Sequence, residues 1–250
     1  MLQVGLIGTP LGHSGSADYF ARCYPDCRYR AYELSSLDKL RTLVKEERLD
    51  GFNVTIPYKQ AILSHLDAID DEARAIGAVN CVSVHRIDGI LHLTGHNTDN
   101  RAFAETLKPL LQSWHRRALV LGTGGAAHAV AYALQRLGID YTFVSRHPRQ
   151  HPDTIGYGQV ADNLVGTGHS EPCTVLINAT PLGMWPRTDQ TPLPDLEGVG
   201  SEHLCYDLVY NPPQSRWLHD CSLRGATVCN GLAMLYRQAD MSHQLWSEGI

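Results

Sequence analysis

The sequence reads ALVLGTGGAA from Ala118 to Ala127, an apolar run that passes directly into a glycine-rich turn. The run Ala118–Leu121 predicts a buried strand, and the amphipathic pattern after the turn predicts a helix. Gly122, Gly124 and Ala127 occupy the positions of a G-x-G-x-x-A turn, where small residues allow a tight turn and a close approach to pyrophosphate. The amides at the start of the helix favour an anion. This segment therefore predicts a Rossmann dinucleotide-binding unit.

The segment after the next predicted strand distinguishes between the two nicotinamide cofactors. The strand Tyr141–Val144 is followed by SRHPR (residues 145–149), which contains no Asp or Glu to bind the 2′-hydroxyl of NAD. Guanidinium groups pair bidentately with phosphate, so Arg146 and Arg149 favour the 2′-phosphate of NADP(H). Two arginines on a solvated loop would give the same sequence, and the preceding glycine turn is what favours the cofactor interpretation.

A methyltransferase that uses S-adenosylmethionine is a second interpretation of the glycine turn. The sequence NPPQ at residues 211–214 superficially resembles the Asn-Pro-Pro-aromatic motif of enzymes that methylate amino groups. Gln214 stands where an aromatic residue would stack on a flipped base, and the formal net charge of -5 disfavours a nucleic-acid substrate. This class therefore carries less weight than a dehydrogenase.

Length and composition describe an ordinary globular chain. Its 250 residues can bury roughly three quarters of the unfolded surface, enough for one large domain or two smaller ones. The seven cysteines form no CxxC pair and the histidines lack metal-ligand spacing, so we expect no disulfide framework and no metal site. No apolar run suits a signal peptide or a membrane span, so we expect a cytoplasmic protein with a small-molecule substrate and neither a membrane nor a nucleic-acid partner.

Short apolar runs alternate with longer amphipathic segments, which is typical of an α/β fold. A capped helix start at Thr98–Leu107, followed by a polar cluster, places a boundary between two domains in this region. We predict strands at Gln3–Ile7, Tyr29–Leu34, Gly51–Ile56, Ala118–Leu121, Tyr141–Val144, Thr174–Asn178, Leu204–Leu208 and Ala226–Val228.

The segment GFNVTIPYK (residues 51–59) carries polar groups on a strand that otherwise looks buried. Phe52, Val54 and Ile56 would share one face, while Asn53 and Thr55 would share the other. Pro57 ends the strand and suits the first turn of a helical segment from Tyr58 to Ile69, so Lys59 lies where a strand passes into a helix. In an open α/β sheet, that edge binds ligands.

Several spaced motifs, taken together, resemble the shikimate dehydrogenase family. Separately, each motif could be a turn or a helix cap. The ordered match extends from residue 13 to residue 238 and consists of S-x-S, N-x-T-x-P-x-K, G-A-V-N, N-T-D, G-x-G-G-A, I-N-A-T-P-L-G-M, D-L-V-Y-N-P and G-L-x-M-L-x-x-Q. Ala17 replaces a usual proline after the two serines, which affects the helix below them and not the chemistry.

The resemblance implies an α/β fold of two domains. These are an N-terminal α/β substrate-binding domain (residues 1–99) and a Rossmann NADP-binding domain (100–230), with a C-terminal helix (231–250) that returns to the first domain. It also implies the NADPH-dependent, reversible reduction of 3-dehydroshikimate to shikimate in the route to chorismate and aromatic amino acids. The oligomeric state is expected to be a monomer or a homodimer.

The resemblance further implies roles for individual residues. Lys59 and Asp99 match the family's catalytic pair. The expected substrate contacts are Ser14, Ser16, Asn53, Thr55, Asn80, Tyr210 and Gln238. The expected cofactor contacts are Gly122, Thr123, Gly124, Gly125, Ala126, Ala127, Ser145, Arg146, Arg149, Thr180, Leu208 and Gly231.

The chemistry of these residue types agrees with such a reaction. A polyhydroxylated ring needs neutral hydrogen-bonding side chains, and a lysine ammonium stabilises the charge that hydride transfer leaves on a carbonyl oxygen. A relative that acts on quinate and can use NAD, and a non-catalytic shikimate-binding protein, are the alternatives. The arginines oppose NAD, and a binding protein would not need Lys59 together with Asp99.

Overall fold

The computed structural model describes residues 1–11, 15–148, 153–166 and 171–248, and the chain divides into two compact units. Unit 1 contains Met1–Ala102 and Leu235–Ile250, and unit 2 contains Phe103–Met234. One division lies inside helix α5 (Asp99–Leu107) and the other inside helix α9 (Leu232–Ser247). The sequence analysis placed the domain boundaries after residues 99 and 230, whereas the two units divide after residues 102 and 234.

Unit 1 is built on a six-stranded mixed sheet with the order β2-β1-β3-β5-β6-β4. Strand β1 is parallel to β2 and β3, while β5 is antiparallel to both β3 and β6, and β4 is parallel to β6. The carboxyl ends of β1, β3 and β6 therefore share one edge of the sheet with the amino end of β5. The strands are β1 (Leu2–Gly8), β2 (Cys27–Glu33), β3 (Gly51–Val54), β4 (Ala68–Ile69), β5 (Cys81–Ile87) and β6 (Ile90–His96).

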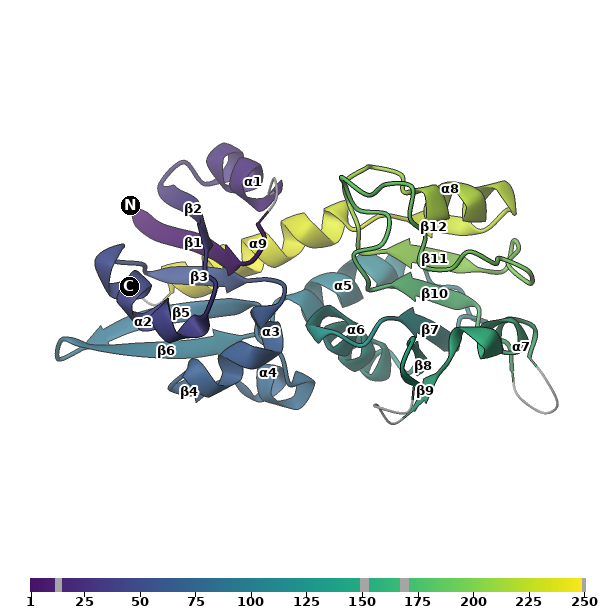
Figure 1. The fold of residues 1–250 in the computed structure, drawn as a ribbon, viewed down its shortest axis with the longest axis horizontal. Coiled ribbons are helices and arrows are strands. Elements are labelled where there is room, and N and C mark those ends of the chain that lie inside the picture. The colour runs from purple at the N-terminus through teal and green to yellow at the C-terminus, as the bar shows by residue number, and fades with distance from the viewer. Residues whose placement is uncertain (12–14, 149–152, 167–170, 249–250) are drawn as a thin grey trace. The chain divides into compact units, whose positions relative to one another are not determined.

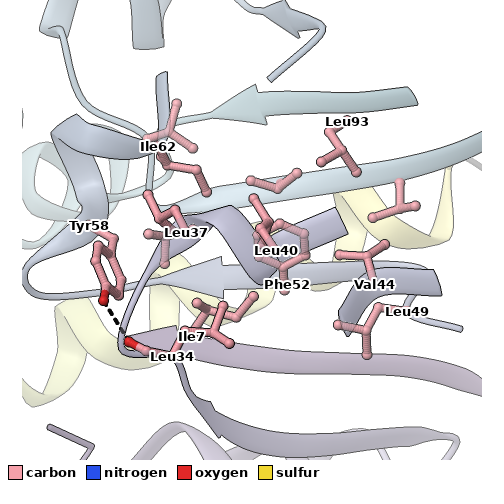
Figure 2. Close-up of a cluster of buried hydrophobic side chains, with 14 of the residues drawn as sticks. Ile7, Leu34, Leu37, Leu40, Val44, Leu49, Phe52, Tyr58, Ile62 and Leu93 are labelled. Atoms are coloured by element: carbon pink, nitrogen blue, oxygen red, sulfur yellow. Dashed lines mark hydrogen bonds between the residues drawn. The ribbon is translucent and has the colours of Figure 1, made fainter. Parts of the chain in front are cut away.

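Helices pack on both faces of this sheet, and each face has its own apolar cluster. On one face, Phe52 and Val54 of β3 belong to an apolar cluster with Leu40 and Val44 of α2 (Leu40–Glu46). Figure 2 shows Phe52, Leu40 and Val44 in this cluster. On the other face, α1 (Gly15–Cys23) and α9 contribute to a cluster around β1 (Figure 1). The C-terminal helix therefore returns to the first domain, as predicted. Short helices complete the unit: α3 (Tyr58–Ala61), α4 (Asp71–Ile76) and 3-10 turns at Leu37–Lys39 and Ile62–His65.

Two predicted boundaries around β3 are wrong. The strand ends at Val54 and not at Ile56, and the Ile56 side chain, which we expected on the apolar face, is 56% exposed. The predicted helical segment also ends early, because helical turns stop at His65 and Ala68–Ile69 forms a strand. Tyr58 shows why the chain turns here: its ring is buried in the apolar cluster and its hydroxyl donates to Leu34 O at 2.5 Å (Figure 2).

Unit 2 is built on a six-stranded sheet in which every strand pair is parallel, in the order β12-β11-β10-β7-β8-β9. Counted along the chain from β7, this is the 3-2-1-4-5-6 order of the Rossmann fold, as predicted. The order reverses between β7 and β10, and ligands bind at such a point. The strands are β7 (Arg117–Leu121), β8 (Asp140–Val144), β9 (Thr154–Ile155), β10 (Val175–Asn178), β11 (Leu204–Asp207) and β12 (Thr227–Cys229).

The helices of unit 2 connect its parallel strands. Helix α6 follows β7, and the packed core includes Leu119 and Leu176 from the sheet and the fully buried Trp217 from α8. The helical segments are α6 (Gly125–Arg136), α7 (Val160–Val165), α8 (Arg216–Leu223) and 3-10 turns at Lys108–Leu110 and Tyr157–Gln159. Within the described part of the chain, no helix is both long and apolar enough to cross a membrane.

Gly51 lies where the sheet of unit 1 packs closely against Trp246 of α9. A Cβ atom at this position would lie 2.2 Å from Cδ1 of Trp246. The indole is 2% exposed, and its Nε1 donates to Val82 O at 3.0 Å. The ring is thus fixed by packing and by a hydrogen bond, so it has no room to yield to a methyl group.

We expect Gly51→Ala to lower the free energy of unfolding of unit 1 by about 1–3 kcal/mol through overpacking. Chemical denaturation followed by tryptophan fluorescence measures the loss. In the Trp246→Leu background the added methyl group should cost less, because the indole ring is gone. Equal costs in the two backgrounds would contradict the proposed contact.

Candidate active site

Three polar side chains that are distant in sequence meet at one edge of the sheet in unit 1. Lys59 lies in α3 after β3, Asp99 begins α5 after β6, and Asn80 directly precedes β5. Because β5 runs antiparallel to its neighbours, its first residue reaches the same edge as the last residues of β3 and β6. The sheet topology therefore collects all three residues.

Lys59 and Asp99 form a short and largely buried ion pair. Lys59 Nζ lies 2.6 Å from Asp99 Oδ2, and the two side chains are 16% and 7% exposed. The other carboxylate oxygen, Asp99 Oδ1, accepts a hydrogen bond from Asn80 Nδ2 at 2.9 Å. Since each oxygen has its own partner, the carboxylate plane is held in one orientation. The ammonium has three N–H donors, so an ion pair with one oxygen leaves it able to donate to a ligand.

A buried hydrogen-bond network holds Asn80 in place, and Asn80 in turn orients the carboxylate of Asp99. Asn80 Oδ1 accepts from Thr98 N at 2.7 Å, and Asn80 Nδ2 also donates to Thr98 Oγ1 at 2.9 Å. Asn53 Nδ2 donates to Ser242 Oγ of α9 at 2.8 Å and to Asn80 O at 3.2 Å. Ser242 Oγ in turn donates to Gln238 O at 2.9 Å. These contacts connect the edge of the sheet to the C-terminal helix.

Asn53 has a supporting role in this network. Its Oδ1 accepts from Tyr29 OH at 3.0 Å, so both ends of the amide already have protein partners, and the residue is 4% exposed. Its expected contact with substrate stays a prediction. Sequence reasoning missed Thr98 and Ser242; the signal for Ser242 was its position four residues after Gln238, on the same face of the helix.

The other expected substrate contacts divide between the two units. Ser16 is buried in the first turn of α1, Thr55 is half-buried just beyond β3, and Gln238 is buried on α9. Gln238 Nε2 donates to Leu235 O at 2.8 Å. Tyr210 belongs to unit 2, where it is half-buried after β11. Ser14 lies outside the described residues.

The glycine turn of unit 2 has the shape that a pyrophosphate requires. Gly122 has φ 108°, in the region that favours glycine, and a Cβ there would lie 3.0 Å from Thr180 Cγ2. Gly124 is the N-cap of α6, and a Cβ on it would meet nothing within 4 Å. Thr123, Gly125 and Ala126 complete the turn, and Ala127 is fully buried against the sheet. A dinucleotide fits this turn, because open space faces the start of the helix.

The end of β8 presents positive charge without an acid. Arg146 is exposed and makes no ion pair with any described residue. Ser145 Oγ accepts from His147 N at 3.1 Å, which shapes the turn after the strand. Arg149 lies outside the described residues. An exposed guanidinium at this strand end fits a 2′-phosphate.

Comparisons with known proteins agree with this geometry. Residues 6–82 match the family described as the shikimate dehydrogenase substrate binding domain. A curated shikimate dehydrogenase (NADP(+)) from Shouchella clausii (strain KSM-K16) is 36% identical over 261 residues, which cover 98% of this chain and 92% of the relative. The chain belongs to the shikimate dehydrogenase family.

Solved structures show that the family resemblance extends over the whole chain. Shikimate 5-dehydrogenase from Thermus thermophilus, in complex with NADP(H) and shikimate, has a TM-score of 0.83 and 32% identity, covering 99% of this chain and 94% of that one. The ligand-free 5-ketofructose reductase of Gluconobacter sp. strain CHM43 has a TM-score of 0.75 and 29% identity, covering 98% and 92%. The predicted family and fold are confirmed. The second structure shows that this fold also occurs in a reductase named for a different carbonyl compound.

A buried carboxylate lies at the end of β11, beside other expected cofactor contacts of this dehydrogenase fold. Asp207 is fully buried, and burial raises its pKa from 3.8 to about 6, although hydrogen bonds from Ser215, Val209 N and Asn178 oppose the rise. Leu208 follows it, and Gly231 lies so close that a Cβ on it would be 2.2 Å from Leu208 O. The structure thus brings Leu208 and Gly231 together, while Thr180 lies against Gly122.

The raised pKa of Asp207 predicts a pH dependence of stability. Between about pH 4 and about pH 6, the folded protein holds a proton on Asp207 that the unfolded chain has released. Stability therefore falls as the pH rises through this window. Over the range from pH 4 to pH 7, we expect the free energy of unfolding of the wild type minus that of Asp207→Asn to be largest at pH 4 and to decrease by about 2 kcal/mol by pH 7.

Chemical denaturation of both proteins at a series of pH values measures this difference. Asp220→Asn on α8 is the matched control, because that carboxylate is 40% exposed and its ion-pair partner among the described residues is Arg216, at 3.6 Å. The expected control difference changes little over the same range. A wild type minus Asp207→Asn difference that stays flat from pH 4 to pH 7 would contradict the assignment.

Proposed function

We propose that this chain is an NADP-dependent shikimate dehydrogenase, an oxidoreductase that reversibly reduces 3-dehydroshikimate to shikimate on the route to chorismate and aromatic amino acids. The observation that carries the proposal is the buried Lys59–Asp99 ion pair, with Nζ and Oδ2 2.6 Å apart, in a chain of the shikimate dehydrogenase family. The names of the curated relative and of the Thermus structure support the substrate and the cofactor.

In the proposed reaction, Lys59 and Asp99 act as the catalytic pair. Bound NADPH supplies a hydride to the carbonyl carbon, which leaves negative charge on the carbonyl oxygen. The Lys59 ammonium donates a hydrogen bond to that oxygen and stabilises the charge, and a proton from the Lys59–Asp99 pair completes the hydroxyl group. Asp99 holds the ammonium in place and accepts a hydrogen bond from a substrate hydroxyl, while Asn80 keeps the carboxylate oriented.

Neutral side chains bind the ring of the substrate in this proposal. The contacts are Ser14, Ser16, Asn53, Thr55, Asn80 and Gln238 from unit 1, with Tyr210 from unit 2. Ring hydroxyls are both donors and acceptors, and hydroxyl and amide side chains match them. Asn53 contributes mainly through Asn80 and Ser242, its partners in the buried network.

Unit 2 is the proposed cofactor domain. The turn Gly122–Ala127 holds the pyrophosphate, Ser145, Arg146 and Arg149 hold the 2′-phosphate, and Thr180, Leu208 and Gly231 line the other half of the site. The open space at Gly124 and the exposed Arg146 support this placement. We further propose a cytoplasmic enzyme, monomeric or homodimeric, that has small-molecule ligands and neither a membrane nor a nucleic-acid partner.

Steady-state assays with shikimate or quinate, each with NADP or NAD, test the activity through absorbance at 340 nm. We expect the highest kcat/KM with shikimate and NADP. Highest activity with quinate and NAD would support the alternative dehydrogenase. A folded protein that gives no absorbance change with any pairing would exclude both.

The proposed catalytic role of Lys59 leads to a separate prediction. We expect Lys59→Ala to lower kcat by a factor on the order of 10² to 10⁴ while the affinity for NADPH stays unchanged, because the ammonium acts on the reacting oxygen and not on the cofactor. Lys39→Ala, at an exposed lysine in the 3-10 turn Leu37–Lys39, is the matched control. An effect confined to the KM for shikimate would make Lys59 a binding group.

The proposed role of Arg146 at the 2′-phosphate predicts a preference for NADP over NAD. We expect Arg146→Ala to weaken the binding of NADP about tenfold or more, as for a lost charge-assisted hydrogen bond, and to leave the binding of NAD almost unchanged. Fluorescence titration with each reduced cofactor measures both constants. Arg136→Ala, at an exposed arginine in the last turn of α6, is the control. Equal losses for the two cofactors would contradict a role at the 2′-phosphate.

A further inference from the structure

The loops after β10 and β11 meet at the buried carboxylate of Asp207. Its Oδ1 accepts from Asn178 Nδ2 at 2.8 Å and from Val209 N at 3.0 Å, and its Oδ2 accepts from Ser215 Oγ at 2.5 Å. Ser215 is the N-cap of α8, and its hydroxyl also accepts from Leu218 N at 3.3 Å. One carboxylate thus holds the end of β10, the chain after β11 and the start of α8.

The network continues from Asn178 toward the glycine turn. Asn178 Oδ1 accepts from Thr180 N at 3.0 Å and from Thr180 Oγ1 at 2.6 Å. Asn178 Nδ2 donates to Asp207 and also to Leu182 O at 3.2 Å, and these two bonds fix the orientation of an amide whose oxygen holds Thr180. The methyl group of Thr180 faces Gly122, where a Cβ would approach it to 3.0 Å.

A second branch runs along the backbone after β11. Leu208 N donates to Asn178 O at 3.0 Å, and Gly231 packs directly on the backbone of Leu208. Gly231 N donates to Val209 O at 3.2 Å, so the segment before α9 is tied to the same loop. Thr180, Leu208 and Gly231 are thus all held, directly or through one intermediate, by groups that contact Asp207.

The position of this network in the sheet indicates which part of a dinucleotide it faces. A Rossmann sheet consists of two mononucleotide-binding halves that meet where the strand order reverses. The half made of β7, β8 and β9 carries the glycine turn and Arg146, which suit the pyrophosphate and the adenosine 2′-phosphate. The half made of β10, β11 and β12 carries Asn178 and Asp207 and therefore faces the nicotinamide nucleotide.

We propose that Asp207 is a positioning residue that places Thr180 and Leu208 against the nicotinamide half of the cofactor. This inference rests on the proposed NADP-dependent function. It assigns no contact between Asp207 and the cofactor, because the carboxylate is fully buried and its three hydrogen-bond donors, Asn178, Val209 and Ser215, belong to unit 2. Asp207 acts through Asn178 and through the backbone at Val209.

Two ligands distinguish a loss of positioning at the nicotinamide half of the site from a general loss of structure. NADPH occupies both halves of the site, whereas adenosine 2′,5′-bisphosphate carries only the adenosine 2′-phosphate end. We expect Asp207→Ala to raise the Kd for NADPH about tenfold or more, since buried donors lose their acceptor, and to change the Kd for adenosine 2′,5′-bisphosphate less than twofold. We also expect kcat to fall with the KM for shikimate unchanged.

Further variants keep the test decisive if Asp207→Ala does not fold. Asp207→Asn keeps one oxygen for Asn178 and Val209 and should recover most of the NADPH affinity. Asn178→Ala should raise the Kd for NADPH to a similar extent. The double variant Asn178→Ala/Asp207→Ala should bind NADPH no more weakly than either single variant, because the two residues act in one chain of contacts. Asp220→Asn on α8 is the control with unchanged affinities.

Each outcome decides one claim. Equal weakening of both ligands, or no weakening of either by Asp207→Ala and Asn178→Ala, would overturn the positioning role. A wild type that binds NADPH normally but does not oxidise shikimate would overturn the proposed substrate and leave the positioning role standing. A wild type that binds neither nucleotide would overturn the cofactor assignment itself.

Discussion

The ion pair between Lys59 and Asp99 depends on one topological constraint, the insertion of antiparallel β5 between β3 and β6. Asn80 directly precedes β5, so the position of this strand places the Asn80 amide beside the carboxylate of Asp99. Burying two charges costs several kcal/mol for each ion unless the remaining hydrogen-bonding groups are satisfied. Asn80 meets this requirement, because it satisfies the second oxygen of Asp99 while the first oxygen faces Lys59. The strand order and the electrostatics of the site are therefore linked.

The need of buried polar groups for hydrogen-bond partners also explains why the last helix of the chain returns to the first unit. Asn53 and Gly51 lie on the face of β3 that α9 covers, and the cover brings Ser242 to Asn53 and Trp246 to Gly51. A buried amide needs partners for both its donors and its acceptor. Asn53 finds one of them only on α9, so the C-terminal helix completes the polar layer below the ion pair as well as the apolar core.

The sequence was most informative where a local pattern alone determines the structure. Gly122 adopts φ 108°, which favours glycine, and the turn from Leu121 to Ala127 predicted the Rossmann unit from local sequence. The strands β4, β5, β6 and β9 were missed. For the β5–β6 hairpin a signal was present: Asp88 and Gly89 have φ 51° and 79°, which suits the two-residue turn that Asp-Gly favours. Residues 82–85 and 91–94 also alternate between apolar and polar side chains, so the sequence carried the strand pattern as well as the turn.

Contacts between distant segments set the limit of prediction at the site. Lys59 and Asp99 could be paired from family motifs, but nothing near Asn53 in the sequence indicates that its amide is bound by Tyr29 and Ser242. The exposure of Ile56 has a similar origin, because alternation predicts the inward face only while the strand continues, and β3 ends two residues earlier.

The two buried carboxylates, Asp99 and Asp207, suit different roles because their interaction partners differ. Asp99 faces a cation, Lys59, and a single amide, so its charge is matched beside a group that can reach a ligand. Among the described residues, Asp207 accepts from the neutral donors Asn178, Val209 and Ser215, and burial raises its pKa to about 6. Neutral donors fix the geometry of a carboxylate and offset the cost of burying its charge only in part, which suits a residue that joins loops. A carboxylate paired with an ammonium suits a residue that holds a catalytic charge in place.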